Sequence, residues 1–430
     1  MWWLFVKKLI NVLTYFISLG IIGFVIWYFY DIYKCKTLTG KITYYDNNIM
    51  EIATYNEAFY SFNYDNQECK LNDEVKVFYT GKLEDTSPIQ NITIKKISKI
   101  KRQETNITKK LATMSLEEKV GQLLLARVPL THKIDDLKTY HLGGYILYQR
   151  DIKNKTKKEV QTEIKSYQKE SNFPLFIAID EEGGTVSRLN GNDNITKEKF
   201  LSPKELYQKG GFDLIEKDAI RKRDLLQELG INLNLAPVAD MSNDENSFIF
   251  ARTFGSNAEE TSQYIKTILK TQNDKVFYVL KHFPGYGDNL DTHTGNAIDN
   301  RSLKTFEEKD FKPFISGIDN GAKFIMLSHN IVSNVDNVPT SLSKIWHNIL
   351  RNQLHFEGII LTDNLSMKAS QINTSTPYID AVKAGNNLLI VSDYKAAFKE
   401  IYEAIQNKII TEAFIDTLIF KTLTFKDKII

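Results

Sequence analysis

Cysteine and proline are scarce in this sequence of 430 residues, which contains two cysteines and nine prolines. The cysteines, Cys35 and Cys69, form no CxxC or Cys/His pattern with the spacing of a zinc site. They could form a disulfide only if their region lies outside the cytoplasm, so the sequence leaves their pairing open. Few prolines and 42% hydrophobic residues exclude a chain that is largely disordered.

A strong charge of either sign is also lacking, because 55 basic residues nearly balance 53 acidic ones and leave a net charge of +2. Nucleic-acid-binding proteins usually carry a basic face, so no nucleic-acid partner is predicted. No motif for nucleotide, flavin or metal binding stands out, and we therefore expect neither a cofactor nor a metal. A small or neutral polar substrate is compatible with this composition.

The first 35 residues contain an uncharged run, Leu9–Tyr30, that is rich in Ile, Leu, Val and Phe. At about 1.5 Å per residue, this run can cross a hydrocarbon core of about 30 Å as a helix. Aromatic residues cluster at its two ends, as they do at membrane interfaces: Trp2, Trp3, Trp27, Tyr28 and Tyr30. A cleaved signal peptide and a buried core helix are the alternatives, but no small-residue cleavage site follows the run. We therefore predict a single-pass transmembrane anchor over residues 1–35.

Beyond the anchor, the sequence pattern changes twice. Residues 36–100 predict a small β-rich domain of unknown role, because alternating runs such as Lys41–Tyr45 and Glu74–Tyr79 are typical of strands. The polar stretch 101–110 is predicted to be a linker. Over residues 111–430, short apolar runs alternate with longer segments of helical spacing, which indicates an α/β domain. These apolar runs are Gly121–Arg127, Leu142–Tyr148, Pro174–Asp180, Ile231–Val238, Val276–His282, Lys323–His329, Gly358–Asp363 and Asn387–Ser392.

Eight buried strands that alternate with helices favour a (β/α)8 TIM-type barrel. An open doubly wound sheet has the same rhythm, but this segment has the size of a barrel and lacks a G-x-G-x-x-G fingerprint after its early strands. In such a barrel the functional site lies at the carboxyl ends of the strands. Polar side chains at these ends are expected to converge on one mouth: Asp180, Asp240, Lys281, His282, His329 and Asp363.

Three sequence motifs occupy these strand ends. They are Ile179-Asp180-Glu181-Glu182-Gly183-Gly184, followed by Arg188; Lys281-His282-Phe283-Pro284-Gly285-Tyr286-Gly287-Asp288, running on to Asp291-Thr292-His293; and Thr362-Asp363-Asn364-Leu365-Ser366-Met367. With the supporting segments Gly230–Pro237 and Arg252–Gly255, they resemble glycoside hydrolase family 3, specifically its β-N-acetylglucosaminidase branch, over roughly residues 111 to 425. One such motif would be weak evidence for the family, whereas the whole set in the family's order is specific evidence for it.

The resemblance implies roles for the matching positions. Asp363 stands where the family has its nucleophile, and His293 with Asp291 stands where this branch has its acid/base pair. The matching sugar-binding positions are Asp180, Arg252, Lys281 and His282. Arg188, which follows the first motif, and His329, which ends a strand, are further candidates for substrate binding; for His329 a buried ring with satisfied hydrogen bonds is the alternative. The implied substrate is a terminal β-linked N-acetylglucosamine, typically on peptidoglycan fragments.

The residues themselves are suited to this chemistry. A retaining glycosidase needs a carboxylate that attacks the anomeric carbon and a group that protonates the leaving oxygen. Histidine titrates near neutrality, so His293 can donate and then accept a proton, and Asp291 can orient its ring. Asp363 could instead cap a helix, and the histidines and aspartates of the second motif could bind a metal, although no HExxH or close His-x-His spacing supports a metal.

We therefore predict a retaining exo-β-N-acetylhexosaminidase in the cell membrane, with its catalytic domain outside and a glycan and the membrane as partners. The alternatives are another family 3 exo-glycosidase, such as a β-glucosidase, and a non-catalytic membrane protein that binds wall glycans. The family often has histidine where Tyr286 stands and aspartate where Asn364 and Asn387 stand. These departures concern substrate detail and the surroundings of the site more than the reaction.

Overall fold

The computed structural model describes residues 36–46, 49–54, 59–63, 73–81, 92–99, 106–289 and 297–427. They form two compact units, one within residues 36–99 and the other within residues 106–427. The predicted anchor over residues 1–35 lies outside the described residues, as do Cys35 and Cys69. No helix in the described ranges combines the length and the apolar composition that crossing a bilayer requires.

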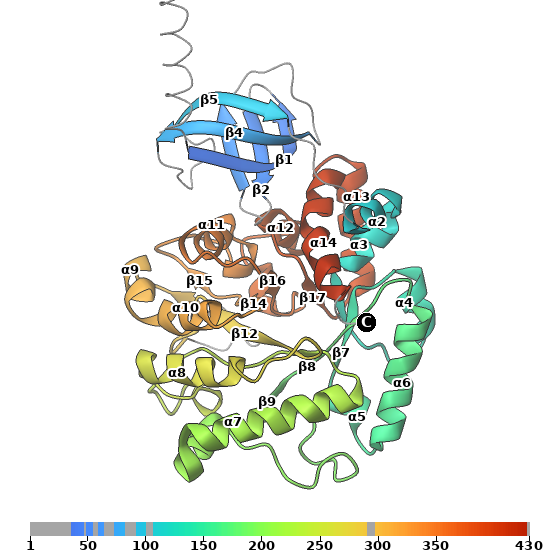
Figure 1. Ribbon diagram of the computed structural model, residues 1–430, viewed down its shortest axis with the longest axis vertical. Helices are drawn as coiled ribbons and strands as arrows, with labels where there is room; N and C mark the ends of the chain where they lie inside the picture. Colours follow the sequence, from blue (N-terminus) through green and yellow to red (C-terminus); the bar gives the residue numbers. More distant parts are fainter. Residues whose placement is uncertain are drawn as a thin grey trace, which may run out of the picture. The chain divides into compact units, whose positions relative to one another are not determined.

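The first unit is an antiparallel sheet of five strands in the order β3-β2-β1-β4-β5 (Figure 1). The strands are β1 Lys36–Asp46, β2 Ile49–Thr54, β3 Phe59–Asn63, β4 Glu74–Gly81 and β5 Ile92–Lys99. Alternate side chains of β4 point inward, and Val75 and Val77 are fully buried together with Ile42 of β1. The two strands predicted in this region, Lys41–Tyr45 and Glu74–Tyr79, are therefore confirmed.

The second unit has an α/β fold built around a nearly closed barrel of eight parallel strands. In sheet order they are β16 Ile359–Thr362, β14 Phe324–Leu327, β12 Phe277–Phe283, β11 Leu233–Asn234, β8 Phe176–Ile179, β7 Gly144–Leu147, β6 Leu124–Arg127 and β17 Leu389–Val391. A parallel bridge between Leu361 and Leu388 joins the two ends of this order. Each predicted apolar run overlaps one strand, which agrees with a TIM-type barrel and not with an open sheet.

Helices surround the barrel on its outside (Figure 1). They are α2 Asn106–Thr113, α3 Leu116–Gln122, α4 Lys133–Thr139, α5 Gln149–Ile152, α6 Lys157–Glu170, α7 Pro203–Leu229, α8 Ala258–Leu269, α9 Leu303–Thr305, α10 Phe311–Asp319, α11 Lys344–Asn348, α12 Pro377–Ala384, α13 Tyr394–Gln406 and α14 Glu412–Lys426. Short strands add a hairpin, β9 Glu181–Gly183 with β10 Val186–Ser187, and a parallel pair, β13 Ile298–Asp299 with β15 Ile331–Val332.

The chain enters the barrel through α3, whose start is encoded locally. The Ser115 hydroxyl accepts a hydrogen bond from the Glu118 N–H, and the Glu118 carboxylate accepts one from the Ser115 N–H, which together form a capping box. Near its end, a Cβ on Gly121 would lie 2.1 Å from the carbonyl oxygen of Tyr140. Only glycine allows the helix to approach that segment so closely.

The predicted linker over residues 101–110 needs a correction, because its last five residues belong to α2. Ile107 and Leu111 are one helical turn apart and both are buried, and α2 packs against α14. The polar composition of this stretch concealed the spacing of these two apolar side chains, which is typical of an amphipathic helix.

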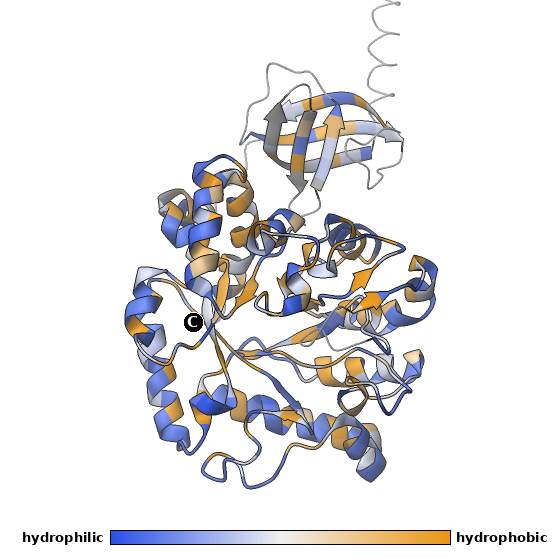
Figure 2. Cartoon of the chain, turned by 180° about the vertical axis from the view of Figure 1, so that it is seen from behind, coloured by the Kyte–Doolittle hydropathy of each residue, from blue (hydrophilic) through white to orange (hydrophobic). Residues whose placement is uncertain are grey.

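Apolar side chains from alternate strand positions fill the inside of the barrel, and Figure 2 shows the strands as predominantly hydrophobic. Phe324 lies at the centre of this packing, with its ring centroid 5.5 Å from those of Phe176 and Phe277. A second cluster fills the space between the strands and the outer helices, around Trp346 and Phe283. The barrel is therefore a packed core, and a substrate can enter only at its rim.

Candidate active site

A cavity of about 250 Å³ opens at the carboxyl ends of the barrel strands. Its lining residues are Ile146, Tyr148, Asp180, Glu182, Val186, Arg188, Leu235, Arg252, Lys281, His282, Met326, Asp363, Asn364 and Ile390. Six of the nine predicted site residues are among them: Asp180, Arg188, Arg252, Lys281, His282 and Asp363. The strand ends thus bring together residues up to 183 positions apart in the sequence, as the barrel predicts.

The β9–β10 hairpin after β8 carries Glu182 and Arg188, and buried asparagines of β11 fix it. Asn234 clamps the backbone of Glu181, because its Oδ1 accepts from the Glu181 N–H at 3.0 Å and its Nδ2 donates to the Glu181 carbonyl at 3.1 Å. Asn232 holds the start of β8 by two similar bonds. An apolar side chain could not do this, because only an amide can both accept from and donate to the neighbouring backbone at the same position.

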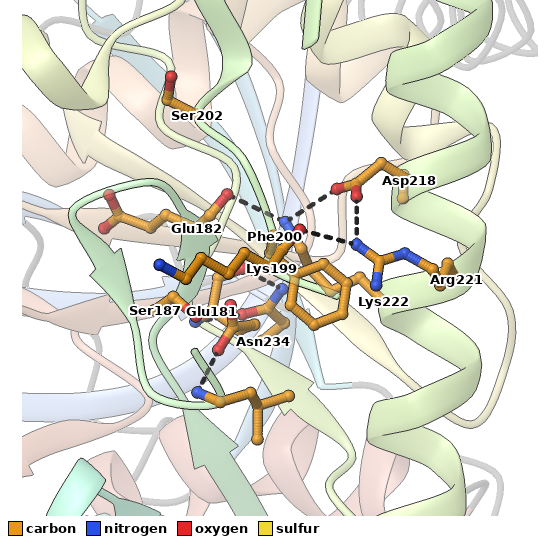
Figure 3. Close-up of polar contacts among 12 residues, drawn as sticks. Glu181, Glu182, Ser187, Lys199, Phe200, Ser202, Asp218, Arg221, Lys222 and Asn234 are labelled. Atoms are coloured by element: carbon orange, nitrogen blue, oxygen red, sulfur yellow. Dashed lines mark hydrogen bonds and ion pairs between the residues drawn. The ribbon is translucent and has the colours of Figure 1, made fainter. Parts of the chain in front are cut away.

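The two adjacent glutamates of the first motif have opposite surroundings (Figure 3). Glu182 lines the cavity, whereas Glu181 is fully buried beneath the hairpin, where its Oε2 accepts from the N–H groups of Arg188 and Leu189 at 2.9 and 3.0 Å. Burial raises the pKa of Glu181 above its ordinary value. On the outer side, Lys222 donates to the Glu182 carbonyl oxygen at 3.0 Å. The Glu181 carboxyl group and the Lys222 ammonium therefore both support the segment that presents Glu182 and Arg188.

An ion network forms the floor of the cavity. Lys281 Nζ lies 2.9 Å from Asp180 Oδ1 and 2.6 Å from Glu182 Oε1. Arg252 binds Glu182 with two nitrogens, at 3.0 and 2.8 Å, and Arg188 Nη2 lies 3.1 Å from Asp180 Oδ2. Three cations thus surround two carboxylates, and the geometry of the Arg252–Glu182 contact is the strong bidentate form.

These contacts set the charge of both carboxylates. Burial by itself would raise the pKa of Asp180, but Lys281 and Arg188 outweigh it and hold that pKa below its ordinary value. Burial likewise opposes ionisation of Glu182, whereas Arg252 and Lys281 lower its pKa to about 2. Both groups are ionised at neutral pH, so the floor offers fixed hydrogen-bond acceptors next to fixed cationic donors. Such a surface suits the hydroxyl groups of a sugar, each of which can donate and accept.

His282 is held in one orientation beside this network. Its Nδ1 lies 2.6 Å from Asp240 Oδ2, and Asp240 also accepts from the backbone N–H groups of His282 and Tyr286 at 3.0 and 2.7 Å. On the other side, Arg252 Nη2 lies 3.3 Å from His282 Nε2. Because arginine can only donate, Nε2 is the acceptor, and Nδ1 carries the ring proton and donates a hydrogen bond to Asp240.

Asp363 follows β16 and lines the cavity on the side of β17. Its N–H donates to the Leu327 carbonyl at 3.0 Å, and its Oδ1 accepts from the Asn364 N–H at 2.7 Å. The next helical turn begins at Lys368 with Met367 at its N-cap position, so Asp363 does not cap a helix. Its carboxylate therefore faces the same space as the ion network.

Tyr148, at the end of β7, faces both Asp363 and Asp180. Burial, followed by the fields of these two carboxylates, raises the pKa of Tyr148 to about 12. The Arg127 and Arg188 guanidinium groups lie 4.5 and 5.5 Å from the ring centroid. Tyr148 and Glu182 were not among the predicted site residues, although Tyr148 ends a predicted strand and Glu182 belongs to the first motif.

Three predicted site residues do not line the described cavity. Asp291 and His293 lie outside the described residues. His329 is fully buried, with Nδ1 2.7 Å from the Ser341 hydroxyl and Nε2 3.0 Å from the carbonyl oxygen of Asn364. It therefore lies behind the turn that carries Asp363, where it can position that turn without reaching the cavity.

The three departures from the family pattern have different surroundings. Asn364 lines the cavity and donates to the Ser392 hydroxyl at 3.0 Å. Tyr286 is buried with its ring edge against His282. Asn387 lies beneath the barrel wall, where its Oδ1 accepts from Arg351 at 3.1 Å and from the Ile360 N–H at 2.8 Å. Only the first of these can contact a ligand directly. Within the described ranges, no group of three or more histidine, cysteine, aspartate or glutamate side chains could hold a metal ion.

Comparisons with known proteins identify the family of the second unit. The family model for the glycosyl hydrolase family 3 N-terminal domain matches residues 115–424. Curated relatives named beta-hexosaminidase include one from Hydrogenovibrio crunogenus, 30% identical over 268 residues that cover 60% of this chain and 74% of the relative. Another, from Nitrosomonas eutropha, is 30% identical over 290 residues that cover 65% of this chain and 80% of the relative.

Among solved structures, a glycoside hydrolase family 3 beta-N-acetylglucosaminidase from a Paenibacillus species resembles this chain with a TM-score of 0.69 and 28% sequence identity. The match covers 74% of this chain and 63% of that protein. The fold of the second unit is thus one that this chain has in common with a known glycoside hydrolase family 3 enzyme.

Proposed function

The chain belongs to glycosyl hydrolase family 3 and is a β-hexosaminidase-type glycoside hydrolase, and from this membership we propose that it removes terminal β-linked N-acetylglucosamine with retention of configuration. The observation that carries the proposal is the position of Asp363, whose carboxylate faces a cavity with a floor of fixed charges. We further propose that peptidoglycan-derived glycans are the substrate, and that the predicted N-terminal helix holds the enzyme at the outer face of the cell membrane.

The size of the cavity supports exo action. At about 250 Å³ it lies just below the range for small-molecule sites, about 300–1,000 Å³, which suits one sugar ring and not an extended glycan. Asp180, Glu182 and Lys281 are the groups that would bind the ring hydroxyls, because their mutual ion pairs fix them before substrate arrives.

In the first step, the Asp363 carboxylate forms a bond to the anomeric carbon while the bond to the leaving oxygen breaks. His293 donates the proton that this oxygen receives, with Asp291 orienting the imidazole. In the second step, the neutral imidazole takes a proton from water, the resulting oxygen attacks the anomeric carbon, and Asp363 leaves as a carboxylate. The motif alone supports the roles of Asp291 and His293.

The test is release of p-nitrophenol from its β-N-acetylglucosaminide and from its β-glucoside by the full chain. We expect turnover of the first substrate only, and Asp363→Asn to lower kcat by a factor of about 10³ or more because it removes the nucleophile. Asp319→Asn, an exposed aspartate at the end of α10, is the matched control and should retain full activity.

Other outcomes would redirect the proposal. Preference for the glucoside would favour a β-glucosidase, and binding of N-acetylglucosamine without turnover of any glycoside would favour a non-catalytic wall-binding protein. Full activity of Asp363→Asn would remove the nucleophile assignment. The configuration of the first product, read by NMR before it mutarotates, distinguishes retention, which gives the β-anomer, from inversion.

A further inference from the structure

The first motif places three acidic residues in a row, and the middle one differs from its neighbours in lacking an ionic partner. Asp180 lies 2.9 Å from Lys281 and 3.1 Å from Arg188, and Glu182 lies 2.6 Å from Lys281. Glu181 is fully buried, and no basic side chain of the described ranges lies within 4.0 Å of its carboxyl oxygens. Its two neighbours are therefore compensated ions, whereas Glu181 is not.

The hydrogen bonds of Glu181 need an acceptor and not a charge. Its Oε2 accepts from the N–H groups of Arg188 and Leu189, at 2.9 and 3.0 Å, where the chain leaves β10. Its Oε1 is buried and has no hydrogen-bond partner in the described part of the chain. A negative oxygen there would be a buried charge without compensation, whereas a protonated oxygen leaves only a neutral hydroxyl without an acceptor. The uncharged acid is therefore the form that fits this place.

The charged and polar groups around Glu181 favour the same form. Burial has the largest influence on the pKa of Glu181 and raises it. The charge of Lys222, the Ser187 hydroxyl and the two N–H donors lower this pKa, but they do not offset burial. Part of the lysine charge is already neutralised by Asp218, whose Oδ2 lies 3.6 Å from its Nζ, and Asp218 also pairs with Arg221 at 2.8 Å.

Lys222 of α7 links Glu181 to the wall of the catalytic cavity (Figure 3). Its Nζ donates to the Glu182 carbonyl oxygen at 3.0 Å, and its charge acts on the Glu181 carboxyl group. The lysine is 8% exposed and lies between Asp218 and the Phe200 ring, whose centroid is 5.2 Å from Nζ. A negative charge on Glu181 would compete with the Glu182 carbonyl for this ammonium.

We propose that Glu181 is a positioning residue that acts in its uncharged form, and that its ionisation at alkaline pH weakens sugar binding by drawing Lys222 away from the Glu182 carbonyl. Glu181 does not line the cavity, so it acts only through the backbone of its neighbours. Without the lysine, the Glu182 carboxylate is no longer fixed against Lys281 and Arg252, from which it lies 2.6 and 2.8 Å. The inference rests on the proposed glycosidase function, because it concerns the affinity for the sugar.

The first test is calorimetric titration of the full chain with N-acetylglucosamine, a sugar that has no group titrating near neutral pH. From about pH 5.5 to 9 we expect the Kd of the parent to rise roughly threefold or more, because only uncharged Glu181 supports tight binding. On the alkaline side, binding should also take up protons, which titrations in two buffers of different ionisation enthalpy measure.

Variants assign this pH dependence to Glu181. Glu181→Gln keeps an acceptor for both N–H groups and cannot ionise, so the part of the pH dependence that Glu181 causes should disappear, with proton uptake lower by as much as about one proton. Other titrating groups act alike in both proteins and cancel in the comparison. Glu181→Leu removes the acceptor and should bind weakly at every pH. Glu216→Gln, an exposed glutamate on α7, is the matched control and should follow the parent.

The second test needs no sugar. An infrared difference spectrum between the parent and Glu181→Gln should contain the C=O band of a protonated carboxyl group on the acidic side of the range, and carboxylate bands should replace it as the pH rises. Carboxylate bands alone over the whole range would overturn the inference and leave the glycosidase proposal intact.

The outcomes of the titration also separate the two proposals. If the Kd of the parent and that of Glu181→Gln depend on pH in the same way, the role of uncharged Glu181 is refuted and the glycosidase proposal stands. If N-acetylglucosamine binds at no pH, the sugar proposed as substrate is wrong and the inference fails with it. If Glu181→Leu does not fold, the comparison of the parent with Glu181→Gln still decides the question.

Discussion

Replacing Lys281 by methionine is expected to remove the cation that joins two carboxylates at the floor of the catalytic cavity. The lysine is 2% exposed, and its Nζ contacts Asp180 and Glu182 at 2.9 and 2.6 Å. Removing one partner of a buried ion pair costs about 3–5 kcal/mol, because the remaining charge stays out of water. Arg188 and Arg252 still face these carboxylates, so we expect the lower end, about 3 kcal/mol.

Urea unfolding measures the free energy that the contact contributes, when it is applied to the parent, Lys281→Met, Asp180→Asn and the double variant. The two substitutions should be non-additive by about 1–3 kcal/mol, since they remove the same ion pair. Lys217→Met, an exposed lysine on α7, is the matched control and should change the free energy of unfolding by less than about 0.5 kcal/mol. Additivity within about 0.5 kcal/mol would show that the pair does not act as a unit.

The same variant has a signature in acid. Burial opposes ionisation of Asp180, but Lys281 and Arg188 lower its pKa in the folded state. Such a carboxylate adds stability above its unfolded-state pKa of about 3.9, and this stability is lost as the pH falls toward the folded-state pKa. Lys281→Met raises the folded-state pKa, so the parent should lose more stability than the variant below about pH 4. If the stabilities of the parent and of Lys281→Met fall in parallel below about pH 4, the reasoning is contradicted.

Three further predictions concern buried polar groups. Burial lowers the pKa of Lys426, which is 0% exposed. Between this lowered pKa and the unfolded-state pKa of about 10.4, the free energy of unfolding should rise with pH by up to about 1.36 kcal/mol per pH unit. Lys426→Met should abolish that slope. Burial raises the pKa of Glu181, so the folded protein loses stability as the pH rises through that pKa. Glu181→Gln should remove this loss. A Glu181→Gln variant that is less stable than the parent at about pH 8 in urea unfolding would contradict this prediction. Asn234→Ala leaves the two backbone groups of Glu181 without partners, so it should cost about 2–4 kcal/mol in urea unfolding and lower kcat/KM, whereas unchanged values would show that the clamp is dispensable.

The strands of the barrel could be predicted because each is a short apolar run bounded by polar residues, and the carboxyl end of each strand is then fixed by the fold. Asp180, Lys281 and Asp363 were therefore identified as residues of one mouth without knowledge of any contact. The helix over residues 106–110 was missed because only Ile107 and Leu111 mark its buried face, and polar residues surround them.

Side-chain direction could not be predicted in the same way. Glu181 and Glu182 are adjacent and chemically alike, and only the hairpin geometry directs Glu182 into the cavity and Glu181 beneath it. His329 ends a strand like Asp363, yet packing against Ser341 turns its ring away from the cavity. Such choices depend on contacts between distant segments, which periodicity does not encode.

The most direct test of the account is to trap the covalent intermediate. A 5-fluoro derivative of an aryl β-N-acetylglucosaminide with a good leaving group slows hydrolysis of the intermediate more than its formation, so the glycosyl-enzyme accumulates. After proteolysis and mass spectrometry, the account predicts one sugar residue on the peptide that contains Asp363, and none on Asp363→Asn. Turnover with no labelled peptide, or a label on another carboxylate such as Asp180, would contradict the assignment of Asp363 as the nucleophile.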